Sequence, residues 1–358
     1  MPGFYKTYIN IFICFILYNL VVDCFNPAFS LITQLNHPLA ALAVVPVFAF
    51  KIGYQTSDLS KFIRLLFVTC LLFGFLFLFP IAGKNVHAQA LACYYAVIPL
   101  FLFSFEKKEY RLFCIFLLIL GFGFSQVSES RTIILRILLF TGLLVSLSMV
   151  KKWSFLKGLV VLTTAFFIVQ FLTNLETYLE LFKNYTGTIN FDDEDTRTFL
   201  YKEVFGDMKP HELILGRGFQ GTYFSNYFLW LQTNNHDFSG DHYYRFSVEV
   251  GFLQFLVKGG FVYFGLYVTP LIVSCYRGLF TRHNSRIAFL ISIYILTELF
   301  IIFIENIPAY HFQFFIIFFL AGFAYRKTQE PGKLVLKNKI GIHEDFDHNT
   351  LIQSGAVY

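Results

Sequence analysis

Long apolar stretches, each of a length that crosses a membrane, follow one another along most of this chain and constrain its fold more than any other feature. A bilayer core of about 30 Å needs about 20 apolar residues in a helix. Within each stretch the residues are continuously apolar, without the alternation of apolar and polar residues that a barrel strand shows. The stretches therefore predict transmembrane helices. Only 14% of the residues are charged, against about 25% in soluble domains, which excludes a soluble globular protein. The candidate spans cover residues 5–23, 28–50, 62–82, 87–105, 111–126, 131–150, 154–173, 251–276, 287–305 and 309–325.

One long polar segment, residues 173–245, interrupts this series between the seventh and eighth candidate spans. The distribution of Lys and Arg over the connecting segments places both termini in the cytoplasm and the polar segment outside it. We therefore expect an all-α polytopic membrane protein with about ten transmembrane helices and one large extracytoplasmic loop. The expected domains are N-terminal transmembrane helices at 1–172, the loop at 173–245, C-terminal transmembrane helices at 246–326 and a cytoplasmic tail at 327–358.

Composition and charge also narrow the range of ligands. The net charge of +5 is modest and the basic residues lie between apolar runs, which gives no support for nucleic-acid binding. The six cysteines form no CxxC pair, so neither a zinc site nor a disulfide framework is expected. The acidic run Asp192–Asp195 is more typical of a solvated helix start than of a metal site. We expect no metal and no cofactor.

The polar segment is predicted to contain one amphipathic helix. Asp192 or Asp193 would cap it, helical spacing continues from Arg197, and Pro210 would end it. Arg197 and Tyr201 are one turn apart and would share a face.

Arginines at the outer helix ends and in the loop are candidate ligands for an anion. Arg131 lies at the outer end of the sixth candidate span, and Arg136 lies further into the same helix. Arg217 lies in Leu215–Phe219, a predicted tight turn whose backbone N–H groups can also face an anion. Because a guanidinium binds phosphate in a bidentate way, a lipid-borne phosphate is one interpretation. Membrane-edge anchors and ordinary surface charges are the alternative.

His242 and Glu249 lie where the chain re-enters the membrane and are candidates for proton transfer. An imidazole titrates near neutral pH, so His242 is a candidate general base. Glu249, seven residues further on, would share its face in a helix and would orient the His or act as the base. An interfacial hydrogen bond is the alternative for His242, and His236 is a competing candidate.

Glu298 falls in the middle of the ninth candidate span, with Glu305 seven residues further on. An ionisable side chain inside a membrane helix is a functional candidate. We therefore expect Glu298 to line a substrate groove or a proton path, and a hydrogen bond between packed helices is the alternative.

Several short motifs follow one another in order along the outer part of the chain. They are Ser128-Glu-Ser-Arg131, Arg197-x-x-x-Tyr201, Leu215-Gly-Arg-Gly-Phe219, and His242 ahead of an apolar span that contains Gly251, Gly259 and Gly260. This order resembles the O-antigen polymerase and ligase superfamily of bacterial surface-polysaccharide assembly, over about residues 125–265 by motif and the whole chain by topology. Members commonly have His-Asn or His-Ser where this chain has His242-Tyr243.

The resemblance implies a metal-independent, inverting transfer of a glycan from a polyprenyl-diphosphate donor at the bacterial inner membrane. The implied roles are diphosphate binding for Arg131, Arg197, Arg217 and Arg245, proton abstraction for His242 or Glu249, and lining of the substrate groove for Tyr201 and Glu298. The implied partners are the lipid bilayer, the polyprenyl-diphosphate-linked oligosaccharide, a chain-length regulator and a flippase.

Three functions are compatible with this reading. A polymerase joins two lipid-linked repeat units, whereas a ligase transfers the finished glycan to a lipid or protein acceptor, and both need nearly the same residues. We expect a polymerase. A polysaccharide or ion-coupled transporter would spread ionisable residues through many spans, whereas here they concentrate in one loop.

Arg197→Ala is expected to abolish the polymer because it removes a guanidinium from the diphosphate, while the amount of protein stays unchanged. A gel profile of the surface polysaccharide beside an immunoblot measures both. Polymer of normal length in this variant would contradict the arginine clamp.

Overall fold

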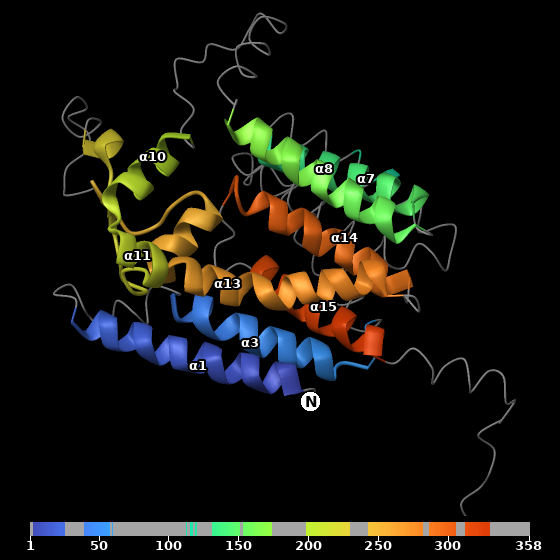
Figure 1. The fold of residues 1–358 in the computed structure, drawn as a ribbon, viewed down its shortest axis with the longest axis horizontal. Helices are drawn as coiled ribbons and strands as arrows, with labels where there is room; N and C mark the ends of the chain where they lie inside the picture. Colours follow the sequence, from blue (N-terminus) through green and yellow to red (C-terminus); the bar gives the residue numbers. More distant parts are fainter. Residues whose placement is uncertain are drawn as a thin grey trace, which may run out of the picture.

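Helices make up most of the described chain and lie side by side in layers (Figure 1). The computed structural model describes residues 3–25, 39–57, 59, 112, 115–116, 119, 131–150, 153–173, 198–229, 243–281, 286–305 and 312–329. The helices are α1 (Gly3–Cys24), α3 (Leu39–Gln55), α7 (Arg131–Met149), α8 (Ser154–Thr173), α10 (Thr198–Asp207), α11 (Pro210–Leu215), α13 (Gly251–Phe280), α14 (Arg286–Ile301) and α15 (Phe312–Gln329), and the strands are β1 (Tyr223–Phe224) and β2 (Tyr244–Arg245).

The predicted mostly helical fold is confirmed, and α1, α3, α7, α8, α13, α14 and α15 lie where the sequence predicts spans. The helix α3 covers Leu39–Gln55, which overlaps the predicted span 28–50 and continues beyond it, and the first part of that span lies outside the described residues. The predicted spans at 62–82 and 87–105, and nearly all of 111–126, lie outside the described residues. Among the described residues, Lys6–Cys24 and Gly251–Phe280 are long and apolar enough to cross a membrane by length and composition. The ten spans, their orientation and the domain boundaries stay predictions.

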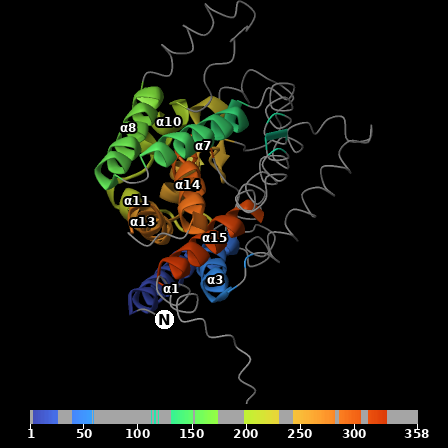
Figure 2. The same ribbon diagram turned by 90° about the vertical axis from the view of Figure 1, so that its right-hand side faces the viewer.

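The helix α14 forms the centre of the helical layers. Every residue from Ala288 to Glu298 is buried, as expected for a helix that is apolar on all sides. Figure 2 shows α14 between the α7–α8 pair and the helices α13 and α15, with α1 and α3 beyond them. Large apolar side chains of α1 and α8, such as Leu17 and Phe155, are exposed on the outside.

The helix α13 is broken by two glycines. Gly259 and Gly260 leave the helical conformation, and Gly260 has φ 64° and ψ −167°, a region that is essentially restricted to glycine. The turn around Gly216 packs into this break. A Cβ atom on Gly216 would meet the backbone of Gly259, and one on Gly260 would meet the carbonyl of Ile214. Close backbone contact therefore joins α11 to α13.

The described part of the polar segment forms a cap, which we define as residues 198–229 and 243–250. The predicted tight turn is confirmed, since Gly216 and Gly218 have φ angles of 76° and 88°. The prediction of one helix ending at Pro210 is wrong. The helix α10 ends at Asp207, and Pro210 begins α11, because proline fits the first turn of a helix.

A shared face for His242 and Glu249 would need a helix over this segment, and its described part, residues 243–250, is not helical. Tyr244 and Arg245 are held extended by antiparallel pairing with β1, and α13 begins only at Gly251. The cap contacts the helices at the turn after α14, where the Tyr201 hydroxyl donates to the carbonyl oxygen of Phe303 at 2.6 Å.

Gly260→Ala is expected to destabilise the protein by about 2 kcal/mol or more, because it combines an unfavourable φ with a backbone clash. The thermal unfolding midpoint of the detergent-solubilised protein measures this. Gly265→Ala is the matched control: it lies in the same helix, a Cβ there meets nothing within 4 Å, and alanine favours a helix by about 1 kcal/mol. Equal midpoints for the two variants would contradict the close backbone contact between α11 and α13.

Candidate functional site

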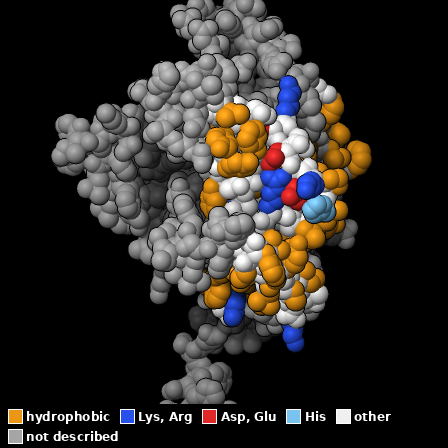
Figure 3. Space-filling model, turned by 90° about the vertical axis from the view of Figure 1, so that its left-hand side faces the viewer, with side chains coloured by type: hydrophobic (Ala, Val, Ile, Leu, Met, Phe, Trp, Pro, Cys, Tyr) orange, Lys and Arg blue, Asp and Glu red, His pale blue; other side chains and the backbone are white. Residues whose placement is uncertain are grey.

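The structure describes only part of the predicted site. Arg197, His236 and His242 lie outside the described residues. Arg131 is the first residue of α7, and only its backbone is described. The remaining predicted residues lie in the cap or just beneath it. Figure 3 shows the cap end of the molecule, where charged side chains gather between apolar areas.

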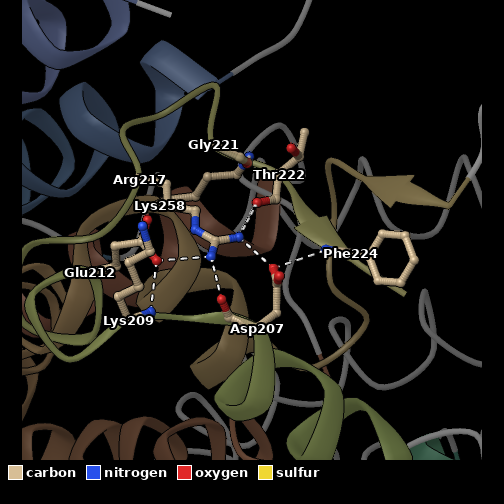
Figure 4. Close-up of polar contacts among 8 residues, drawn as sticks. All are labelled: Asp207, Lys209, Glu212, Arg217, Gly221, Thr222, Phe224 and Lys258. Carbon is tan, nitrogen blue, oxygen red and sulfur yellow. Dashed lines mark hydrogen bonds and ion pairs between the residues drawn. The ribbon is translucent and has the colours of Figure 1, made fainter. Parts of the chain in front are cut away.

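The guanidinium of Arg217 is bound by groups of the cap itself (Figure 4). Its Nη1 donates to Oδ2 of Asp207 at 2.5 Å and to the carbonyl oxygen of Thr222 at 2.9 Å. Its Nη2 donates to the carbonyl oxygen of Asp207 at 2.7 Å and to Oε2 of Glu212 at 2.8 Å. These contacts join α10, α11 and the residue just before β1, so they favour a structural role. Diphosphate binding by Arg217 would require displacing two carboxylates.

The electrostatics of this group follow from its burial and its pairing. Burial lowers the pKa of Arg217, but hydrogen bonds to Glu212 and Asp207 outweigh it, so the pKa is raised. Burial raises the pKa of Glu212, but hydrogen bonds from Arg217 and from the Lys209 N–H outweigh it, and the pKa lies below the ordinary 4.5. Both partners therefore favour the charged forms.

A second buried group, around Lys258, joins the cap to α1. The Lys258 side chain is fully buried before the break in α13, and its Nζ donates to the carbonyl oxygen of Gly221 at 2.7 Å. It also lies 3.6 Å from the ring centroid of Phe246. Asp23, buried near the end of α1, interacts electrostatically with Lys258 and accepts a hydrogen bond from the Gln220 N–H at 3.0 Å. Such partners are required, because a buried charge without them is strongly unfavourable.

Arg245 and Glu249 are the predicted site residues that the structure brings together. Nη2 of Arg245 lies 3.7 Å from Oε1 of Glu249. The guanidinium lies 3.7 Å from the ring centroid of Phe228. The Glu249 side chain is 56% exposed and that of Arg245 is 22% exposed. Glu249 is therefore accessible, whereas the Arg245 side chain is about as exposed as that of Arg217, which is 20% exposed.

Tyr201 connects the cap to the helices beneath it. Its hydroxyl donates to the carbonyl oxygen of Phe303 at 2.6 Å, and its ring stacks on Phe252. Burial raises the pKa of Tyr201 above its usual range. The side chain is thus turned toward the bundle, and its role in a substrate groove stays a prediction.

Glu298 lies in a buried ionic group at the end of α14. Its Oε2 accepts a hydrogen bond from Nε2 of Gln313 at 3.0 Å and lies 3.6 Å from Nε of Arg136. Nη2 of Arg136 lies 3.6 Å from Oε2 of Glu305. Arg136 thus pairs with two carboxylates across α7 and α14. These contacts favour the helix-packing interpretation of Glu298.

Sequence reasoning missed Asp23, Glu203 and Lys258 as members of the polar network. Glu203 accepts hydrogen bonds from the Ser225 hydroxyl at 2.6 Å and from the Tyr227 N–H at 2.8 Å. For Asp23 and Lys258 a signal was available, because each is a lone ionisable residue at or near an apolar run. Glu203 carries no such signal, because it lies in a polar stretch of the sequence, where an ionisable residue is ordinary.

Comparison with known proteins gives no relative: no protein-family model, no curated protein and no solved structure matches this chain.

Arg217→Ala is expected to lower the stability of the cap by about 2 kcal/mol, because it leaves two partly buried carboxylates without their cation. Glu212 contributes its stabilisation above pH 4.5, and this is lost as the pH falls through its lowered pKa. The difference in unfolding midpoint between wild type and variant should therefore narrow in acid. Lys202→Ala, an exposed cation on α10, is the control and should leave the midpoint unchanged. A pH-independent difference would contradict the ion-pair account.

Proposed function

We propose that this chain is an integral membrane glycosyltransferase that polymerises polyprenyl-diphosphate-linked oligosaccharide repeat units. The proposal combines the order of motifs along the sequence with one structural observation. That observation is the Arg245–Glu249 pair just before α13, in which the Glu249 carboxylate is exposed. It supports a site for an anionic, hydroxyl-bearing substrate, because it offers a cation and a carboxylate side by side.

The apolar helices beneath the cap support a lipid-linked substrate. Lys6–Cys24 and Gly251–Phe280 have the length and composition of membrane spans. Both end at the cap: Asp23 of α1 contacts Gln220, and α13 begins directly after Val250, the last residue of the cap. A polyprenyl chain in the bilayer would therefore carry its diphosphate to the level of the cap. In the proposed orientation this is the outer face of the bacterial inner membrane, with both termini in the cytoplasm.

The proposed reaction is a single displacement at the anomeric carbon of the donor sugar. The acceptor hydroxyl oxygen forms a bond to this carbon, the bond to the diphosphate oxygen breaks, and the configuration inverts. His242 or Glu249 takes the hydroxyl proton. Arg131, Arg197 and Arg245 stabilise the charge that the departing polyprenyl diphosphate gains. Arg217 is assigned to the support of the cap, since its guanidinium is held by Asp207 and Glu212.

Deletion of the gene tests the proposal, with surface glycan and lipid-linked intermediates profiled together. Glycan shortened to one repeat unit, with unused lipid-linked repeats, is expected of a polymerase. Full-length polymer held on the polyprenyl carrier would indicate a ligase, and an unchanged profile would favour a transporter and overturn the transferase.

Complementation of the deletion strain with Arg245→Ala tests the site. We expect polymer synthesis to fall about 100-fold, the usual effect of losing one group that stabilises developing charge. Lys202→Ala is the control, since it removes an exposed cation of α10 that is not a member of the pair. Wild-type polymer in the Arg245→Ala strain would remove this residue from the proposed site.

A further inference from the structure

Three aromatic side chains form a compact platform on the small hairpin of the cap. The ring of Tyr244 lies 5.5 Å from that of Phe224 and 5.1 Å from that of Tyr243, and the rings of Phe224 and Tyr243 are 5.8 Å apart. Tyr244 is nevertheless 57% exposed. Its neighbours therefore fix the ring while leaving much of its surface open among the described residues.

The pairing of the strands separates this platform from the buried side of the hairpin. Phe224 pairs with Tyr244, and Tyr223 pairs with Arg245. Successive side chains in a strand point to opposite faces. Tyr223 is only 1% exposed and packs in the core of the cap, so Phe224 and Tyr244 occupy the outer face. Figure 4 shows the Phe224 ring directed away from the group around Arg217.

We propose that Tyr244, supported by Phe224 and Tyr243, binds a sugar ring of the lipid-linked glycan at a position remote from the bond that forms. This inference rests on the proposed function and adds a carbohydrate subsite to it. Tyr244 of the platform and Arg245 of the Arg245–Glu249 pair are adjacent residues of β2, so they lie on opposite faces of this short strand. A glycan of several sugars would reach both.

The chemistry of the surroundings favours a sugar over a lipid chain. A sugar ring has an apolar face of C–H groups that packs on an aromatic ring, and hydroxyls at its edge that need hydrogen-bond partners. A tyrosine held by its neighbours supplies a large, rigid, amphipathic surface with little loss of entropy. Glu249, five positions after Tyr244 in the chain, adds an exposed carboxylate that accepts hydrogen bonds. An acyl chain would gain nothing from this polar group.

A remote subsite contributes to binding more than to the chemical step. Loss of the Tyr244 ring should therefore raise KM for the lipid-linked substrate and weaken binding of the free glycan about tenfold, while kcat changes little. The ring face carries the effect, so Tyr244→Phe and Tyr244→Trp should keep the affinity. Tyr244→Ala and Tyr244→Leu should lose it. Tyr276→Ala is the matched control, because Tyr276 is 65% exposed on α13 and its ring stacks on that of Phe280, away from the cap.

The experiment uses the full chain in lipid nanodiscs. The probe is the oligosaccharide released by mild acid from the lipid-linked repeats that accumulate in the deletion strain. Its binding is measured by calorimetry for the wild type, the four Tyr244 variants and Tyr276→Ala, with near-UV circular dichroism to verify folding. The expected result is a loss confined to Tyr244→Ala and Tyr244→Leu.

Several outcomes would overturn the subsite. The first is no binding of the oligosaccharide by the wild type, and the second is unchanged binding by Tyr244→Ala. The third is full affinity in Tyr244→Leu, which would mean that Tyr244 acts as an apolar membrane anchor. Elongation of lipid-linked repeats by the same nanodiscs is measured separately. A wild type that binds the oligosaccharide through Tyr244 but does not elongate would contradict the proposed polymerase and leave the subsite standing. Elongation by Tyr244→Ala with the wild-type KM would contradict the subsite and leave the proposed polymerase standing.

Discussion

The close contact between the Gly216 turn and the Gly259–Gly260 break determines how the cap is built. Because neither backbone carries a Cβ atom at the contact, the Arg217 N–H reaches the carbonyl oxygen of Val257 at 2.8 Å. The same approach brings Lys258 to the carbonyl of Gly221. A larger side chain at either position would push α11 away from α13 and open both polar groups. The packing of the Arg217 and Lys258 groups therefore depends on the absence of a Cβ atom at these glycines.

Charge in the interior is balanced locally, in three separate groups. Arg217 lies between Asp207 and Glu212, Arg136 lies between Glu298 and Glu305, and Lys258 has a carbonyl, a ring and Asp23 around it. Removing one member of such a group leaves the others buried and uncompensated. A substitution there would thus reduce stability and activity together. Arg245 differs, since its partner Glu249 is mostly in solvent, and substitutions of this pair separate the two effects more cleanly.

The positions of the main helices could be predicted because a long apolar run leaves the backbone few alternatives. The role of Pro210 could not, since proline is compatible with the end of one helix and with the first turn of the next. Nor could the extended Tyr244–Arg245 segment be predicted. Its partner β1 lies some twenty residues earlier, and short strands depend on such distant pairing. Arg217 shows why the role of a site residue could not be predicted. A guanidinium binds a phosphate as well as it binds two carboxylates of the folded chain, and the sequence does not tell which it meets.

The break in α13 also bears on depth in the bilayer. A straight helix over Gly251–Phe280 has 30 residues and would measure about 45 Å, well beyond a hydrocarbon core of about 30 Å. The part after the break, Phe261–Phe280, would match that thickness closely. In the proposed orientation, the two glycines then mark the water–lipid boundary, and the short helical piece that precedes them belongs to the outer, aqueous half of the molecule. Lys258 would be an interfacial cation enclosed by protein, and the cap would rest directly on the plane where polyprenyl head groups emerge.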